Sequence, residues 1–152
     1  MVKVVYFAGP LFTQAEREWN AAIAADLSAR GFEVILPQHR AKALIREGEP
    51  LPVGELFEDA IAGVSRADAV VAVLDGPDPD SGTCFECGYA HAIGRPIVGV
   101  RTDLRLGGDD ASYSVNLKLS RACRRYIRVT AEELQKTTRD VGAELAEVLA
   151  EL

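Results

Sequence analysis

Short apolar runs alternate along this chain with segments whose apolar residues recur at helical spacing. The strand-like runs are Val2–Ala8, Phe32–Leu36, Ala69–Leu74, Pro96–Val100 and Arg124–Val129. The helical segments are Thr13–Arg30, Glu55–Arg66, Thr83–Ile93, Val115–Ala122 and Thr130–Leu152, the last opening with a Thr130-x-x-Glu133 capping box. Two polar segments interrupt the alternation: His39–Gly54 is compatible with a loop or a broken helix, and Thr102–Ser114 with a loop.

Strands that are apolar throughout are typical of a parallel sheet covered by helices on both faces. We therefore predict a single doubly wound, flavodoxin-like α/β domain over residues 1–152, with a five-stranded parallel sheet in the order 2-1-3-4-5. In that order the winding reverses between strands one and three, and ligands bind beyond the carboxyl ends of the strands at such a point. The segments that follow these strands, Tyr6–Phe12 and Asp75–Tyr89, therefore form the candidate site.

The composition narrows the functional classes. The chain has 152 residues and a net charge of -6, which argues against a general binder of nucleic acid or of an anionic membrane. Its apolar runs are too short to span a bilayer, and its first residues lack the charged start and cleavage site of a signal peptide. Three cysteines cannot all pair within one chain, so we expect a cytoplasmic location. No Gly-x-Gly-x-x-Gly or Walker A pattern occurs, and we expect no cofactor.

The segment Asp80-Ser-Gly-Thr-Cys-Phe-Glu86 follows strand three through an acidic, Pro-rich turn. It predicts that Glu86 lies in the first turn of a helix, where the positive helix end favours the ionised carboxylate. A carboxylate so placed can attack a sugar carbon. Asp80 lies across a tight Gly82 turn from Glu86, and two neighbouring carboxylates can take different pKa values. Alternatively, Thr83-x-x-Glu86 is a capping box in which Glu86 only binds the Thr83 N–H.

Other candidate residues have structural as well as functional interpretations. Tyr6 brings a hydroxyl to the switch point if the strand register directs it there, and Gly9 would let a ligand approach the backbone; the alternative is a buried strand and a turn. Asn116 follows a Gly-containing loop and is also a candidate helix cap.

The Cys84-Phe-Glu-Cys87 motif at a helix start is compatible with a thiol redox protein, or with a metal site that includes His91. We favour small packing residues, and we predict no metal. A basic cluster in this acidic chain is interpreted as a solvated or subunit-facing surface, with an anion site as the alternative. The cluster consists of Arg121, Arg124, Arg125 and Arg128.

The residues resemble the nucleoside 2-deoxyribosyltransferase family and its N-glycoside hydrolase relatives over most of the chain. The resemblance rests on Tyr6-Phe-Ala-Gly-Pro-Leu-Phe12, on Asp80-Ser-Gly-Thr-Cys-Phe-Glu86-Cys-Gly-Tyr-Ala90, and on Arg101-Thr-Asp-Leu-Arg105 followed by Val115-Asn-Leu117. The middle piece, a Gly-x-x-x-Glu-x-Gly-x-Ala pattern with an Asp six residues before the Glu, is the most specific.

The resemblance implies transfer of 2-deoxyribose between nucleobases with retention of configuration. Glu86 would attack the anomeric carbon and form a covalent deoxyribosyl-enzyme, Tyr6 would hold Glu86 in place, and Asp80 would bind the hydroxyl end of the sugar. Asn116 would reach the sugar in a neighbouring subunit's site, so the resemblance implies a homo-oligomer built from dimers, such as a hexamer. A 2-deoxy sugar reaches an oxocarbenium-like transition state more easily, so one carboxylate and a proton donor can suffice without a metal or cofactor. The further substrate-binding residues are Gly9, Phe12, Asp59 and Gly82.

Family members commonly carry Asp or Asn at the position that Ala60 occupies here, so this chain departs from the family pattern. Asp59 lies one position before it. The sequence therefore does not identify the group that protonates the leaving base. Hydrolase relatives act on nucleoside monophosphates and tend to place Ser where this chain has Asp80. A carboxylate ~4 Å from a 5′-phosphate costs roughly 4 kcal/mol at an effective dielectric constant of about 20, which favours an unphosphorylated nucleoside. The alternatives are N-glycoside hydrolysis of deoxynucleosides or nucleoside monophosphates, a phosphoribohydrolase-like Gly82-Thr83-x-x-Glu86 loop, and a non-catalytic nucleotide-binding module.

Overall fold

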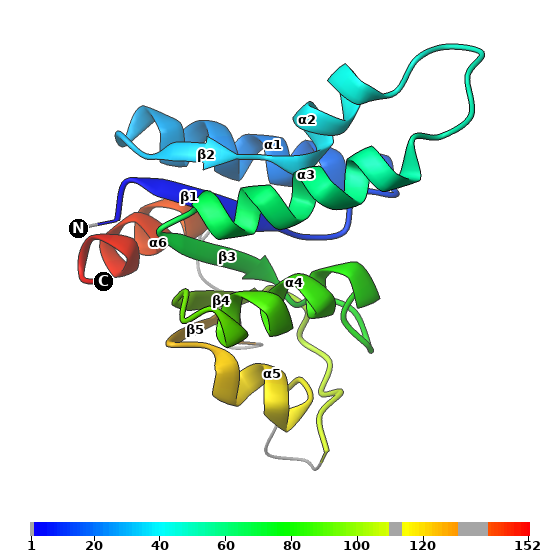
Figure 1. The fold of residues 1–152 in the computed structure, drawn as a ribbon. Helices are drawn as coiled ribbons and strands as arrows, with labels where there is room; N and C mark the ends of the chain where they lie inside the picture. The colour runs from blue at the N-terminus through cyan, green and yellow to red at the C-terminus, as the bar shows by residue number, and fades with distance from the viewer. Residues whose placement is uncertain (1, 110–113, 131–139) are drawn as a thin grey trace.

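A parallel β-sheet forms the centre of the protein. The computed structural model describes residues 2–109, 114–130 and 140–152. These residues build a five-stranded sheet in the order β2-β1-β3-β4-β5, in which all neighbouring strands are parallel (Figure 1). The strands are β1 (Val4–Ala8), β2 (Glu33–Ile35), β3 (Ala69–Val73), β4 (Ile97–Arg101) and β5 (Arg125–Arg128). The predicted fold class and strand order are confirmed.

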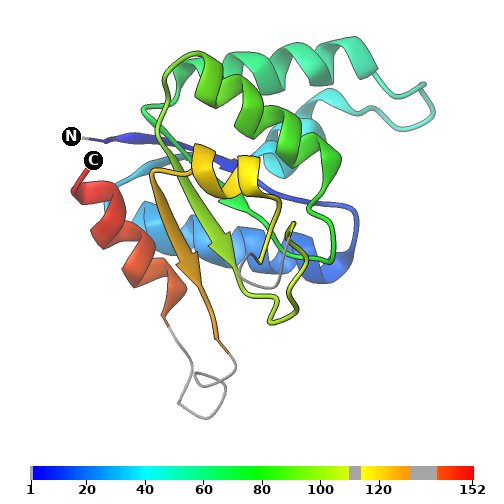
Figure 2. The same cartoon turned by 90° about the horizontal axis from the view of Figure 1, so that it is seen from below.

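Helices cover both faces of this sheet. They are α1 (Gln14–Ala29), α2 (Pro37–Leu44), α3 (Val53–Arg66), α4 (Ser81–Ala92), α5 (Leu117–Ala122) and α6 (Val141–Ala150). Helices α1 and α6 pack on one face and α3, α4 and α5 on the other, as the two orthogonal views show (Figures 1 and 2). Because every strand is followed by a helix that returns the chain, all carboxyl ends of the strands lie along one edge.

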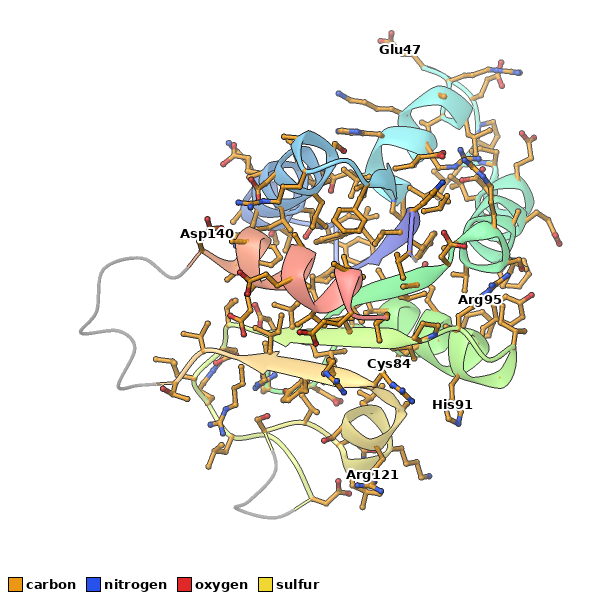
Figure 3. All side chains as sticks on the ribbon, turned by 90° about the vertical axis from the view of Figure 1, so that its left-hand side faces the viewer. Glu47, Cys84, His91, Arg95, Arg121 and Asp140 are labelled. Carbon is orange, nitrogen blue, oxygen red and sulfur yellow. The ribbon has the colours of Figure 1, made fainter. Side chains whose placement is uncertain are left out.

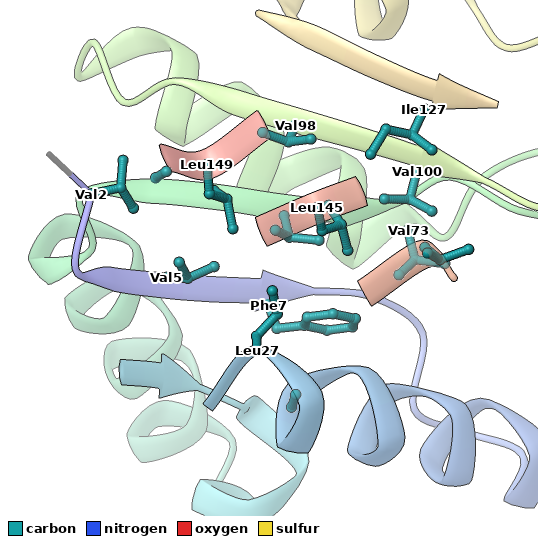
Figure 4. Packing of buried hydrophobic residues seen from close by; sticks show 14 of the residues in the cluster. Val2, Val5, Phe7, Leu27, Val73, Val98, Val100, Ile127, Leu145 and Leu149 are labelled. Carbon is teal, nitrogen blue, oxygen red and sulfur yellow. The ribbon is translucent and has the colours of Figure 1, made fainter. Parts of the chain in front are cut away.

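The alternation of side chains along β1 divides the core into two clusters. Phe7 faces α1 and α6, where it packs with Leu27 and Leu145 (Figure 4). Its neighbour Tyr6 faces the α3–α4 layer, in a cluster with Val64 and Cys87. Since a strand has a side-chain period of two, the burial of Phe7 on one face directs Tyr6 to the other.

Several element boundaries differ from the sequence prediction, and three of the differences affect the argument. The segment after β2 is a regular helix, α2, which begins at Pro37; proline suits the first helical position because no N–H is needed there. Helix α4 begins at Ser81 rather than Thr83, because the Asp80 side chain caps it. Helix α6 begins at Val141 with Asp140 as its cap, so a single helix from Thr130 is wrong. The predicted capping box at Thr130 involves position 133, which lies outside the described residues.

No helix in the described ranges combines the length and the apolar composition that a membrane span requires.

Candidate active site

Tyr6 and Glu86 meet on the α3–α4 side of the sheet. The Tyr6 hydroxyl donates a hydrogen bond of 2.6 Å to Glu86 Oε1. Tyr6 is only 1% exposed in β1, and Glu86 comes from α4, 80 residues further along the chain. The predicted placement of the Tyr6 hydroxyl at the site is therefore found, and it depends on the strand register. A short bond between a phenol and a carboxyl group fixes the direction in which the free oxygen of Glu86 points.

Asp80, rather than the Thr83–Glu86 pair, caps α4. One Asp80 carboxylate oxygen accepts hydrogen bonds from Thr83 N at 2.8 Å and from Thr83 Oγ1 at 3.1 Å. The alternative interpretation of Glu86 as a capping-box residue is therefore wrong. Because the helix starts at Ser81, Glu86 lies in its second turn, not in its first. The influence of the helix end is concentrated in the first turn and is correspondingly weaker at Glu86.

Burial dominates the electrostatics of Glu86. It raises the pKa of Glu86 from 4.5 to about 7; the Tyr6 hydrogen bond opposes this rise and the Asp80 carboxylate adds to it. The positive helix end was expected to favour the ionised carboxylate; burial acts in the opposite direction and sets the direction of the pKa shift of Glu86. Burial and the adjacent Glu86 raise the pKa of Tyr6 well above its usual value, so Tyr6 is a hydrogen-bond donor and not a base.

A second acidic group lies beside this pair. Asp59 on α3 forms a two-point ion pair with Arg40 on α2, with Nε to carboxylate distances of 3.0 and 2.7 Å. Both charges act on the Tyr6 hydroxyl, Asp59 raising its pKa and Arg40 lowering it. A hollow of about 350 Å³ is lined by Arg40, Asp59, His39, Ala43 and Leu44. The structure thus brings Asp59 close to the Tyr6–Glu86 pair and occupies its carboxylate with a guanidinium group.

Arg40 was not among the residues predicted from the sequence, because the segment around it was interpreted as a loop or a broken helix. Pro37 was the available signal: a proline directly after a strand can open a helix as well as end the strand. With α2 formed, Arg40 lies within reach of α3, and its partner Asp59 can be reached only because the two helices pack together.

The chain between β1 and α1 carries two of the predicted residues. A Cβ atom at Gly9 would lie 3.1 Å from Val73 Cγ2, so the close approach that requires glycine is made by the protein's own packing. Phe12 is 73% exposed, and the Arg17 guanidinium holds this segment by donating to the carbonyls of Leu11 and Phe12, each at 2.9 Å. The ring of Phe12 is therefore presented to solvent by a fixed backbone.

Gly82 lies in the first turn of α4, where a Cβ atom would come within 3.1 Å of Asp80 Oδ2. The small residue thus leaves room for the capping carboxylate.

Asn116 is separate from this group. It caps α5 by accepting a hydrogen bond from Lys118 N at 3.0 Å, and its amide donates to Asp109 at 3.3 Å. Within the described residues, its hydrogen bonds connect it to neither Tyr6 nor Glu86. The interpretation of Asn116 as a helix cap is confirmed.

Most of the chain matches the sequence pattern of one protein family. The model of the nucleoside 2-deoxyribosyltransferase family matches residues 5–118, about three quarters of the chain. This range contains Tyr6, Asp59, Asp80 and Glu86. The chain belongs to the nucleoside 2-deoxyribosyltransferase family. Membership indicates an enzyme of the deoxyribosyltransferase and N-glycosidase class that acts on nucleosides or their bases. The resemblance noted from the sequence is confirmed.

Solved structures share the fold over nearly the whole chain. A conserved protein from Enterococcus faecalis V583 is 26% identical, with a TM-score of 0.75 and 99% of each chain covered. A 2-deoxyribosyltransferase from Bacillus psychrosaccharolyticus is 16% identical, with a TM-score of 0.70 over 91% of this chain and 95% of that one. The 2-desoxiribosyltransferase from Leishmania mexicana is 20% identical, with a TM-score of 0.70 and 97% of each chain covered. No curated protein sequence matched the chain significantly.

The cysteines lack the electrostatics of a thiol redox site. Burial raises the pKa of Cys84, and it raises the pKa of Cys87 more strongly. Catalytic thiols of redox proteins require the opposite shift, towards the thiolate. Cys87 packs in the core between α4 and the sheet, as the packing interpretation predicted. In the described parts of the family domain, no group of three or more His, Cys, Asp or Glu side chains is arranged to hold a metal ion.

Two further residues, to which the sequence analysis assigned no role of their own, stabilise the loops at the carboxyl edge. Arg101 is fully buried and donates to the carbonyls of Gly76 at 2.9 Å and Arg105 at 2.8 Å. Asp75 accepts a hydrogen bond from Asp103 N at 2.9 Å, and it also bonds Thr102. Together they connect the loop after β3, which leads to Asp80, to the loop after β4.

Proposed function

We propose that this protein transfers 2-deoxyribose between nucleobases, with Glu86 as the nucleophile. The observation that supports it is the 2.6 Å bond between Tyr6 and Glu86 at the switch point of a nucleoside deoxyribosyltransferase domain. A half-buried carboxyl group that is held by one oxygen and has a pKa of about 7 has the properties of a nucleophile for a sugar carbon.

In the first step, the free oxygen of ionised Glu86 bonds to C1′ while the C1′–N bond breaks. The electron pair of that bond leaves with the base, which takes up a proton. In the second step, a nitrogen of another base attacks C1′, the ester bond to Glu86 breaks, and the carboxylate is regenerated as the new base loses a proton. Two displacements at C1′ retain the configuration of the sugar.

We propose that Asp59 and Arg40 bind the nucleobase. Asp59 has no uncommitted carboxylate oxygen in this arrangement, because the Arg40 guanidinium group donates to both oxygens. As a pair, the two side chains offer an acceptor and a donor for the polar edge of a base beside Tyr6. Asp80 is proposed to bind the hydroxyl end of the sugar through the oxygen that does not cap α4, and a 5′-phosphate would be repelled there.

The decisive assay offers the protein deoxyinosine with free adenine and separates the products by chromatography. Deoxyadenosine is the expected product. Hypoxanthine with free deoxyribose would instead assign hydrolysis, the second candidate, in which water takes the place of the accepting base. Unchanged substrate would contradict both activities. Deoxyinosine monophosphate should react more slowly than the nucleoside, and a faster reaction would refute the role given to Asp80.

The nucleophile is tested separately with a slow 2-fluorinated deoxynucleoside and mass spectrometry. The adduct should lie on the peptide that contains Glu86 and be absent from Glu86→Gln, whose turnover should fall by at least about 10³-fold. Glu58→Gln removes an exposed carboxylate from α3 and serves as the matched control, which should stay active. An active wild type without an adduct would refute the covalent mechanism.

We also propose that the protein works as a homo-oligomer. Phe57 on α3 and Phe85 on α4 are 51% and 55% exposed, and their rings lie next to each other with centroids 6.0 Å apart. Exposed aromatic pairs of this kind are typical of interfaces. Light scattering should give a multiple of the chain mass, and Phe85→Lys should lower it; a monomeric wild type would contradict the proposal.

A further inference from the structure

A hollow of about 660 Å³ lies at the edge of the sheet opposite Tyr6 and Glu86. It is lined by Pro96 and Arg124, which directly precede β4 and β5, and by residues at the carboxyl-terminal ends of α4, α5 and α6. Because all strands are parallel, this is the amino edge of the sheet, whereas the candidate active site is at the carboxyl side. In Figure 3 the strands β4 and β5 run across the view, and Arg95, His91 and Arg121 are labelled on the side where these strands begin.

The hollow is strongly basic although the chain as a whole carries a net charge of -6. Arg95, Arg121, Arg124 and Arg125 line it, and Glu151 is the acidic side chain in the lining. Even if a carboxylate on Leu152, the last residue of this sequence, is counted with Glu151, the four guanidinium groups leave two positive charges in excess.

Most of these guanidinium groups have hydrogen-bonding capacity to spare. Within the described residues, the side chains of Arg121 and Arg124 form no ion pair and no hydrogen bond, and that of Arg125 has one long bond of 3.3 Å to a carbonyl. Arg95 differs, because it donates to the Ser65 carbonyl at 2.8 Å. That bond holds one guanidinium group in place at the wall of the hollow.

Attraction to the helix ends does not account for the whole cluster. Arginines near the last turn of a helix offset its partial negative charge. Here, however, backbone groups already satisfy final carbonyls of the helices: Gly94 N donates to His91 O at 3.1 Å, and Cys123 N donates to Leu119 O at 3.2 Å. Arg121 and Arg124 are therefore not needed as hydrogen-bonding caps of α5. Arg95 does act at a helix end, since the Ser65 carbonyl that it binds lies in the last turn of α3.

We propose that this hollow binds a small molecule that carries two or more phosphate groups. Guanidinium groups match phosphate oxygens in pairs of hydrogen bonds, and four arginines line this hollow. The volume lies within the range of roughly 300–1,000 Å³ that is usual for small-molecule sites. Pro96, Ala122 and Leu152 add an apolar wall on which a ring can lie. The site is separate from the proposed reaction, although α4 connects the two edges of the sheet.

The test is calorimetric titration of the full chain with tripolyphosphate and with ATP, at constant ionic strength. We expect saturable binding with one site per chain for both ligands. ATP binding more tightly than tripolyphosphate would assign a role to the apolar wall, and equal affinities would assign recognition to the phosphate chain alone; both results support the site.

Arg121→Gln/Arg124→Gln should weaken binding by roughly tenfold or more, since each lost contact is a hydrogen bond between charged groups. The control Lys42→Gln/Arg46→Gln removes the same charge from α2 and the segment after it, at the other side of the sheet, and should leave the affinity unchanged. Both variants alter exposed side chains, and their melting temperatures verify that they fold. Absence of saturable binding at millimolar ligand, or equal weakening in both variants, would overturn the proposal.

Discussion

The bond between Tyr6 and Glu86 can be removed with little change in shape. Phenylalanine at position 6 keeps the ring in the cluster between β1 and the α3–α4 layer and deletes only the hydroxyl that donates to Glu86 Oε1. The expected consequence is electrostatic. The hydrogen bond lowers the pKa of Glu86 against the effect of burial, so its loss must raise that pKa further.

The size of this effect follows from the geometry. At 2.6 Å, the bond joins a phenol to a carboxylate, and such charge-assisted bonds contribute about 1.5–3 kcal/mol. Since one pKa unit corresponds to about 1.36 kcal/mol, the pKa of Glu86 should rise by about one to two units in Tyr6→Phe. From a starting value of about 7, the ionised fraction at pH 7 should fall from about one half to a tenth or less.

The assay is the pH dependence of kcat/KM for deoxyribosyl transfer. In the wild type, the rate should rise with pH through about 7 as Glu86 becomes ionised. In Tyr6→Phe this rise should move up by about one to two pH units, so that activity is lost at neutral pH and largely regained at alkaline pH. Tyr126→Phe is the matched control, because it removes a hydroxyl that bonds Ser114 at 2.8 Å near the other edge of the sheet.

An unchanged pH profile in Tyr6→Phe, with the control also unchanged, would refute the assignment of the acid limb to Glu86. A uniform loss of kcat at every pH would show that the hydroxyl orients Glu86 without tuning its ionisation.

Three other substitutions test the remaining parts of the site. In the folded wild type the pKa of Glu86 is about 7, above its ordinary value of 4.5, so the free energy of unfolding falls as the pH rises from 4.5 to 7. Glu86→Gln removes this effect and should be more stable than the wild type by about 2–3 kcal/mol at pH 8, but not at pH 4. Denaturant unfolding at both pH values measures the difference. Asp80→Asn keeps an efficient helix cap but removes the charge that raises the pKa of Glu86, so the acid limb should move to lower pH, opposite to Tyr6→Phe; a shift to higher pH would contradict the electrostatic role of Asp80. Arg40→Gln breaks a partly exposed ion pair with Asp59, so unfolding should change by less than about 1 kcal/mol, whereas KM for the base should rise several-fold; an unchanged KM would remove the pair from the base site.

Local pattern was enough to predict most of the architecture. The apolar runs of β1, β3 and β4 are buried on both sides in the structure, and burial on both sides is the reason why they lack alternating polar residues. The strand order could be inferred because few parallel arrangements place consecutive β/α units without crossing connections. Glu86 and Asp80 were identified because helix and turn signals close together in sequence located them at a strand end.

Helix boundaries were predicted less well, because capping residues compete. Thr83 and Asp80 are both suitable caps, and the sequence does not determine which one begins α4. The choice of Asp80 moved Glu86 into the second turn and away from the positive helix end. Similarly, Pro37 had two local interpretations, and only its packing neighbours made it the first residue of a helix.

The sequence alone determined the class of sheet, because that follows from short-range pattern. It also predicted the edge at which a ligand is expected to bind and the carboxyl groups available there, because these follow from the geometry of parallel strands. Tertiary structure decided which groups touch. Tyr6 meets Glu86 across 80 residues, and Arg40 meets Asp59 between two packed helices. It also decided the pKa of Glu86, because burial and the positions of neighbouring charges depend on the folded arrangement and not on the order of residues along the chain.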